Sequence, residues 1–174
     1  MDRLDRSSKR QRMMERRRAP LPETKFKTTS IAHSAVTSSN TFITGVANGP
    51  DRNERIGRKI KNLFFEGRFQ SGDASLLRCV LYVSKSGTGT ISLTNMYDAV
   101  NPDDFIVLKD WYVKNTGGAT QTTSTQFRHK LQYGLNTEFN GPNQADIVNG
   151  QAVLYIHGSS SNVNGHVRTW YVDN

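Results

Sequence analysis

The residues best suited to chemistry in this sequence are the cations gathered in its first eighteen positions. Residues 1–18 hold eight arginines and lysines against three acids, so eight minus three, or +5, of the formal net charge of +8 lies there. Guanidinium and ammonium groups bind phosphate oxygens, and no aromatic ring is interleaved with them on which bases could stack. We therefore expect sequence-independent binding of a polyanion. The expected contact residues are Arg3, Arg6, Lys9, Arg10, Arg12, Arg16, Arg17 and Arg18.

More cations follow this segment. Pro20 and Pro22 interrupt any helix and are typical of a hinge. Residues 1–27 are therefore expected to form a disordered basic arm, joined to a body of residues 28–174. Weaker candidates for phosphate contacts are Lys25, Lys27, Arg58, Lys59 and Lys61. A solvated strand end is the alternative interpretation of the last three. The arginine-rich block also has the composition of a nuclear import signal.

Residues that could form a catalytic or metal site are few and scattered. The histidines fall on different expected strands, at His33, His129, His157 and His166. Three acids invite a metal or acid–base interpretation, namely Asp103, Asp104 and Asp110. Such acids are ordinary in turns, and no histidine stands nearby in sequence to complete a site. Cys79 is the single cysteine and lies in an apolar run, which predicts a buried, unreactive thiol. We expect no enzyme, no cofactor and no metal site.

The elements that must position these residues are strands. The expected strands are 28–46 (one long or two short), 56–67, 75–85, 105–115, 126–135, 151–157 and 166–173. The pattern of 90–101 is ambiguous, and a short helical turn over the sheet is one interpretation of it. In the second of them, simple alternation would place Ile60, Asn62 and Phe64 on one face and Lys61, Leu63 and Phe65 on the other. Short strands without a long helix favour an all-β two-sheet sandwich or jelly roll. Arg78 interrupts the longest apolar run, so we expect no membrane insertion.

Three motifs follow the arm and hinge in a recognisable order. They are Arg55-Ile56-Gly57-Arg58-Lys59-Ile60, then Leu77-Arg78-Cys79-Val80-Leu81-Tyr82-Val83, then Asn101-Pro102-Asp103-Asp104-Phe105-Ile106-Val107-Leu108-Lys109-Asp110. This order resembles the capsid proteins of small circular single-stranded DNA viruses that encode a replication initiator. It is also similar to the coat proteins of small plant satellite RNA viruses. The resemblance covers most of residues 3–115.

The resemblance implies a single eight-stranded antiparallel jelly roll (a β-sandwich) whose copies, about sixty in simple T=1 icosahedral symmetry, close into a shell. The arm would face inward and neutralise a packaged single-stranded DNA genome. Residues 1–27 carry ten cations and four acids, a net +6, so sixty arms would bring about +360 into one particle. The arm would also act as a nuclear localisation signal for a host import receptor. The protein would then occur in the virion and, during assembly, in the host cell nucleus.

Two alternatives stay open at this point. One is a satellite RNA virus coat protein, which would package RNA with the same kind of arm. The other is a non-viral nucleic-acid-binding or carbohydrate-binding β-sandwich that carries a basic tail and works as a monomer.

Overall fold

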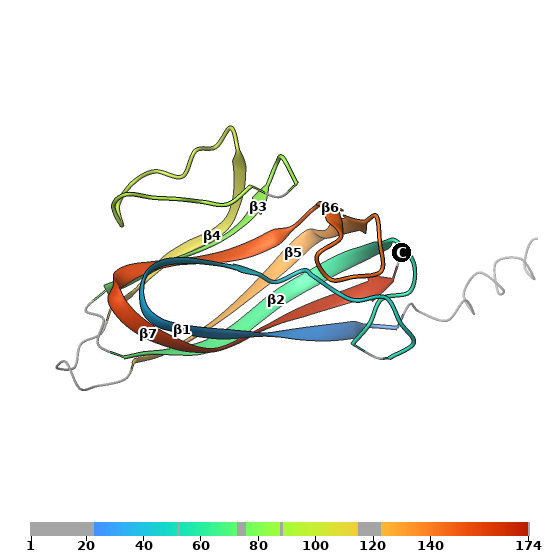
Figure 1. Cartoon of the computed structure of the whole chain (residues 1–174), viewed down its shortest axis with the longest axis horizontal. Helices are drawn as coiled ribbons and strands as arrows, with labels where there is room; N and C mark the ends of the chain where they lie inside the picture. Colours follow the sequence, from blue (N-terminus) through green and yellow to red (C-terminus); the bar gives the residue numbers. More distant parts are fainter. Residues whose placement is uncertain (1–22, 52, 73–75, 88, 115–122, 174) are drawn as a thin grey trace, which may run out of the picture.

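The computed structural model describes residues 23–51, 53–72, 76–87, 89–114 and 123–173, and for 35–36 and 159–161 it describes the backbone alone. These residues form seven strands and no helix (Figure 1). The strands are β1 (Lys25–Phe42), β2 (Lys59–Gly72), β3 (Leu76–Ser84), β4 (Phe105–Lys114), β5 (Thr123–Phe139), β6 (Ile147–Asn149) and β7 (Ala152–Asp173). No membrane-spanning helix is found in this part of the chain.

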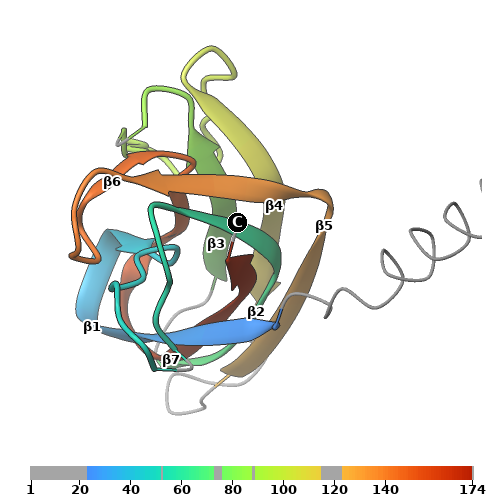
Figure 2. The same cartoon turned by 90° about the vertical axis from the view of Figure 1, so that its right-hand side faces the viewer.

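Strands β1 and β7 are long and bent, and each contributes to two sheets. The first sheet consists of the start of β1, the end of β7, β2 and β5, in that order, with β6 paired to the end of β5. The second sheet consists of the end of β1, the start of β7, β3 and β4. All neighbours are antiparallel, and the two sheets enclose the core when the molecule is viewed end-on (Figure 2).

This strand order is that of a jelly roll. Counting the two halves of β1 and of β7 separately and leaving out the short β6 gives eight segments, ordered 1-8-3-6 in one sheet and 2-7-4-5 in the other. The all-β, eight-stranded antiparallel jelly roll expected from the sequence is confirmed. The hydrogen bonding is continuous between the sheets because β1 and β7 pass from one to the other.

Two of the elements expected from the sequence are wrong; in addition, the bounds of β1, β2 and β5 differ by a few residues from the expected ones and β6 was not expected. The sequence predicts separate strands at 151–157 and 166–173, but residues 152–173 form the single strand β7, which pairs with β1 along almost its whole length. The intervening segment is mostly glycine, serine and asparagine, and such small side chains let a strand bend without leaving the ladder. The helical turn expected at 90–101 is also wrong, because this segment is irregular and contains no helix.

Residues 90–101 nevertheless cover the outer face of the second sheet. Ile91 is buried in a cluster with Tyr82 and Tyr155, and its N–H donates to the Tyr82 hydroxyl at 3.0 Å. Burial raises the pKa of Tyr82 to about 12. The main core lies between the sheets, where Phe65 and Leu154 are fully buried. The second sheet is therefore covered on both sides, whereas no segment among the described residues covers the outer face of the first sheet.

A bulge in β2 decides which side chains reach that surface. The pairing of β2 with β7 shifts by one residue between Asn62 and Phe64. Ile60 and Asn62 face the core, as does Phe65, so Phe64 is on the opposite face from Asn62. The simple alternation that grouped Ile60, Asn62 and Phe64 is therefore wrong, because the extra residue of a bulge reverses the pattern.

Candidate nucleic-acid interface

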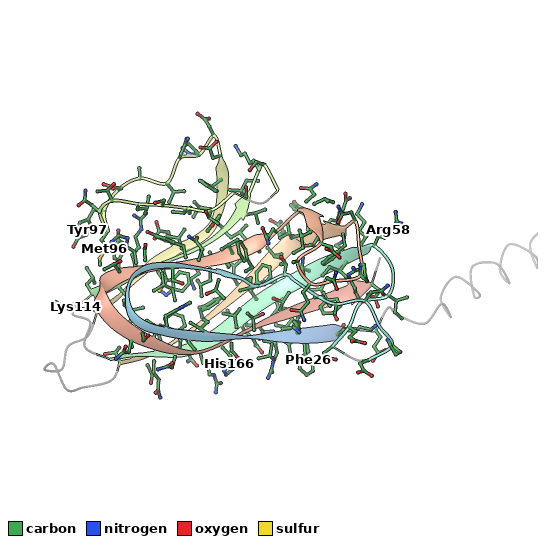
Figure 3. The ribbon with its side chains drawn as sticks, in the orientation of Figure 1. Phe26, Arg58, Met96, Tyr97, Lys114 and His166 are labelled. Atoms are coloured by element: carbon green, nitrogen blue, oxygen red, sulfur yellow. The ribbon has the colours of Figure 1, made fainter. Side chains whose placement is uncertain are left out.

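Outward-facing side chains of the first sheet form rows that cross its four strands. From β1 to β5 the rows are Phe26–Trp170–Phe64–Lys130, then Thr28–Arg168–Glu66–Arg128, then Ser30–His166–Arg68–Gln126. We call these rows, together with Lys61, the basic-aromatic face. Figure 3 shows Phe26 and His166 along one lower edge of the ribbon, on the side away from Tyr97.

The aromatic rings of this face are packed together at the end where β1 begins. The ring centroid of Trp170 lies 5.3 Å from that of Phe64, with 19° between the ring planes, and 5.2 Å from that of Phe26. All three side chains are half-buried rather than covered. Three neighbouring strands thus present one aromatic cluster at the surface.

Two arginines lie over these rings. The guanidinium of Arg128 is 4.5 Å from the ring centroid of Phe64. That of Arg168 is 4.9 Å from Phe26 and 5.8 Å from Trp170. A guanidinium is attracted to the face of an aromatic ring and keeps the N–H groups of its edge available for an anion. The rings therefore hold cationic forks at the surface.

Glu66 contacts both Trp170 and Arg168 of the basic-aromatic face. Its Oε1 accepts a hydrogen bond from Nε1 of Trp170 at 3.1 Å and lies 3.4 Å from a guanidinium nitrogen of Arg168. The side chains of this ion pair are about one-third exposed, so the pair adds little stability. Its effect is to orient the indole ring and the guanidinium relative to each other.

Cations outnumber acids in the grooves of this face. One groove of about 610 Å³ is lined by Arg68, Arg128, Arg168 and Lys109, with Glu66 as its carboxylate. A neighbouring groove of about 630 Å³ is lined by Lys61, Phe64, Arg128 and Lys130. Six cations against one carboxylate give both grooves a positive potential that attracts phosphate.

The chain enters the body at the same end of the sheet. Lys25, one residue before Phe26, is almost fully buried, and its Nζ lies 2.8 Å from the Asp173 carboxylate. The same ammonium donates to the carbonyl of Glu54 at 3.1 Å. These contacts fix the root of the arm beside the C-terminal end of β7.

The sequence-predicted phosphate contacts are placed unevenly. Eight of them lie outside the described residues, namely Arg3, Arg6, Lys9, Arg10, Arg12, Arg16, Arg17 and Arg18. Lys25, expected in the arm, is the first residue of β1, and its ammonium is engaged by Asp173. Lys27 is half-buried and pairs in register with the fully buried Thr169.

The other three predicted cations lie nearer the surface. Lys59 and Lys61 belong to β2, and Arg58 comes immediately before it. Arg58 is exposed at the end of the molecule (Figure 3). Lys59 pairs with Glu138 at 2.6 Å. Lys61 alone of this group lines a groove of the basic-aromatic face.

Sequence reasoning missed most of the basic-aromatic face. The missed residues are Phe26, Phe64, Arg68, Arg128, Lys130, Arg168 and Trp170. A signal was present, because Arg128 and Lys130 alternate on one side of their expected strand. The rows themselves come from four distant segments, and only the register brings them together.

Residues considered for catalysis have structural partners instead. Asp110 accepts two hydrogen bonds from the guanidinium of Arg78, at 3.1 and 2.7 Å. Asp103 and Asp104 form a turn with Asn101, as expected. Cys79 is fully buried, as predicted, and burial raises the pKa of its thiol. Within the described residues, no group of three or more histidines, cysteines and acids is arranged to hold a metal ion.

No protein-family model matches the chain, and no curated protein matches its sequence. Among solved structures, the chain is similar to a chain of the Bacillus endospore appendages, which are disulfide-linked pili, with 12% identity and a TM-score of 0.40 over 88% of this chain and 90% of that one. It is also similar to a chain of the naturally occurring empty particles of cowpea mosaic virus, with 10% identity and a TM-score of 0.44 over 90% and 92%. A third similarity is to Triatoma virus, with 11% identity and a TM-score of 0.33 over 84% and 62%. At scores this low the comparisons assign neither a family nor a function.

Proposed function

We propose that this chain is a capsid protein whose jelly-roll domains assemble into a closed icosahedral shell around single-stranded DNA. The observation that carries the proposal is the position of the basic-aromatic face. It lies on the sheet whose first strand starts where the basic arm ends, so arm and face would form one cationic surface. Jelly rolls build viral shells, and that part of the argument is an analogy of fold.

Many weak phosphate contacts become strong when they act together. One arm with a net charge of +5 over residues 1–18 would bind a single strand weakly at physiological salt. Arms fixed in a shell engage the same strand at high effective concentration, which multiplies their affinity. The arm residues Arg3 to Arg18 are proposed to neutralise the genome inside the shell. The same arm would carry the protein to the nucleus by binding an import receptor before assembly.

The test is the mass and content of the assembled material. Full-length protein is expressed, purified and examined by light scattering and electron microscopy. Closed particles of megadalton mass that protect single-stranded DNA from added nuclease are the expected result. A stable species of about 20 kDa, close to the 19.5 kDa of one chain, contradicts the shell.

The alternative functions give different results in the same experiment. A satellite RNA coat protein would yield particles whose contents, once extracted from the shell, are degraded by ribonuclease and not by deoxyribonuclease. A monomeric nucleic-acid-binding or carbohydrate-binding sandwich would yield no particles. Deletion of residues 1–18 separates the role of the arm, because packaging and nuclear import should both be lost.

A further inference from the structure

We propose that the basic-aromatic face binds unpaired nucleobases by stacking, with Phe64 and Trp170 as the platform and Arg128 and Arg168 as planar cationic partners. The proposal deepens the proposed function, on which it rests, by giving the packaged strand a second and chemically different contact. The arm offers phosphate contacts alone, because no aromatic residue lies within residues 1–18.

The aromatic rings come from one row of the sheet and pack against one another across it. Phe26 is in register with Trp170, and Trp170 is in register with Phe64. The Trp170 and Phe64 rings are nearly parallel, at 19°, with their centroids 5.3 Å apart. Neighbouring strands hold this spacing, so the platform is formed before any ligand arrives.

The position of Phe64 is not explained by core packing. The β2 bulge turns this ring outward, while the next residue, Phe65, fills the core. The three rings are partly buried by one another, and the part of the cluster that stays at the surface leaves apolar area in water, which a bound partner could cover. The surrounding cations favour a polyanion with flat apolar faces as the occupant, and single-stranded nucleic acid has that chemistry.

Phosphates would meet the cations that flank the platform. Lys130 is in register with Phe64, and Arg128 is in register with Glu66 in the next row. A base stacked on the guanidinium of Arg128, which itself lies over the Phe64 ring, would place its phosphate beside Lys61 and Lys130 in the adjoining groove. A duplex, whose bases are already stacked and paired, could use only the phosphate contacts.

The experiment uses the intrinsic fluorescence of Trp170. The chain has two tryptophans, and Trp111→Phe leaves Trp170 as the sole one in the full-length chain. A fifteen-nucleotide oligothymidine strand and a DNA duplex of fifteen base pairs are titrated separately into unassembled protein. Salt is held at about 0.3 M, where the contribution of the arm is much reduced. The single strand should quench Trp170 and bind more tightly than the duplex.

Two variants and one matched control test the platform. Phe64→Leu keeps apolar volume but removes the ring, and it should weaken single-strand binding by about tenfold. Arg128→Lys keeps the positive charge but removes the planar guanidinium on which a base would stack. It should therefore weaken single-strand binding and leave duplex binding unchanged. The control is Tyr97→Leu, since Tyr97 is 76% exposed and lies on the far side of the molecule from Phe26 (Figure 3). It should leave both affinities unchanged.

The outcomes separate this proposal from the proposed function. Equal affinity for single strand and duplex, unaffected by Phe64→Leu, would overturn base stacking and identify a phosphate-only surface. Absence of quenching in protein that still forms nuclease-protected particles contradicts stacking and leaves the shell standing. Quenching by the single strand in protein that never assembles supports stacking and contradicts the shell. If every preparation is assembled, ultraviolet crosslinking of the packaged strand to peptides containing Phe64 or Trp170 gives the same readout.

Discussion

The guanidinium of Arg78 makes a two-point ion pair with Asp110 on the neighbouring strand β4, at 3.1 and 2.7 Å. The same guanidinium donates to the backbone carbonyls of Met96 and Asp98, at 2.8 and 2.6 Å. One buried side chain therefore fastens the irregular segment 90–101 to the second sheet. Arg78 interrupts the longest apolar run of the sequence because its role is to hold this covering layer in place.

Arg78→Met should lower the free energy of unfolding by about 2–3 kcal/mol, because Asp110 and two carbonyl oxygens lose their donor. The loss is at the lower end for a buried ion pair, since the Asp110 side chain is 32% exposed and can be hydrated. Urea unfolding of the unassembled protein measures it. Arg58→Met is the matched control, because Arg58 is exposed, and it should change the free energy by less than about 0.5 kcal/mol. Equal losses in both variants would contradict the anchoring role.

Cys79 should report on global unfolding. The thiol is fully buried in the main core, and burial raises its pKa, so the native protein presents almost no reactive thiolate. A thiol reagent should react with the native protein at least about a hundredfold more slowly than with the urea-unfolded chain. The chain has a single cysteine, which makes the absorbance change easy to assign. Rapid reaction in the absence of urea would mean that the core opens locally.

The class of fold was predictable from the sequence, because local patterns determine it. Alternating β-branched residues and frequent turns predicted an all-β protein, and the structure confirms the jelly roll. Cys79 was also interpreted correctly, since an apolar run predicts burial, whereas the ion pair of Asp110 with Arg78 was not foreseen.

The candidate site was far less predictable, because it depends on register. Phe64 reaches the surface only through a one-residue bulge, which no local pattern of the strand indicates. Arg128 and Arg168 are forty residues apart in the chain and belong to the same row only because β2 lies between their strands. The sequence indicated the cations of residues 1–18. The aromatic side chains that this segment lacks lie on the folded sheet, where only the strand register brings them together.

The stability of the fold should fall below neutral pH. Burial lowers the pKa of His129 below its ordinary value of 6.5, and the charge of Lys109 lowers it further. Burial also lowers the pKa of His33. Since the unfolded chain binds these protons more readily, the stabilisation is complete above about pH 6.5 and is lost as the pH falls from there toward the folded-state values. Urea midpoints at pH 7 and pH 5 should therefore differ, with the lower midpoint at pH 5.

His129→Gln should make that difference smaller, because one of the two groups no longer titrates. The control is His166→Gln, which removes an exposed histidine from the outer face of the first sheet and should leave the difference as it is. A midpoint that rises on acidification, or an unchanged difference in His129→Gln, would show that other groups control the pH dependence.

The dependence of DNA affinity on salt concentration should report how many cations of the arm contact phosphate. With eight arm cations engaged on single-stranded DNA, the arm is expected to contribute about −6 to the slope of log K against log salt, or −0.7 for each cation. Replacing Arg16, Arg17 and Arg18 together by glutamine should reduce the slope by about 2. Lys114→Gln, at the far end of the body from Arg58 (Figure 3), is the control and should leave the slope unchanged. Affinities are measured with unassembled full-length protein at four salt concentrations, and a slope that the triple substitution does not alter would place the phosphate contacts outside the arm.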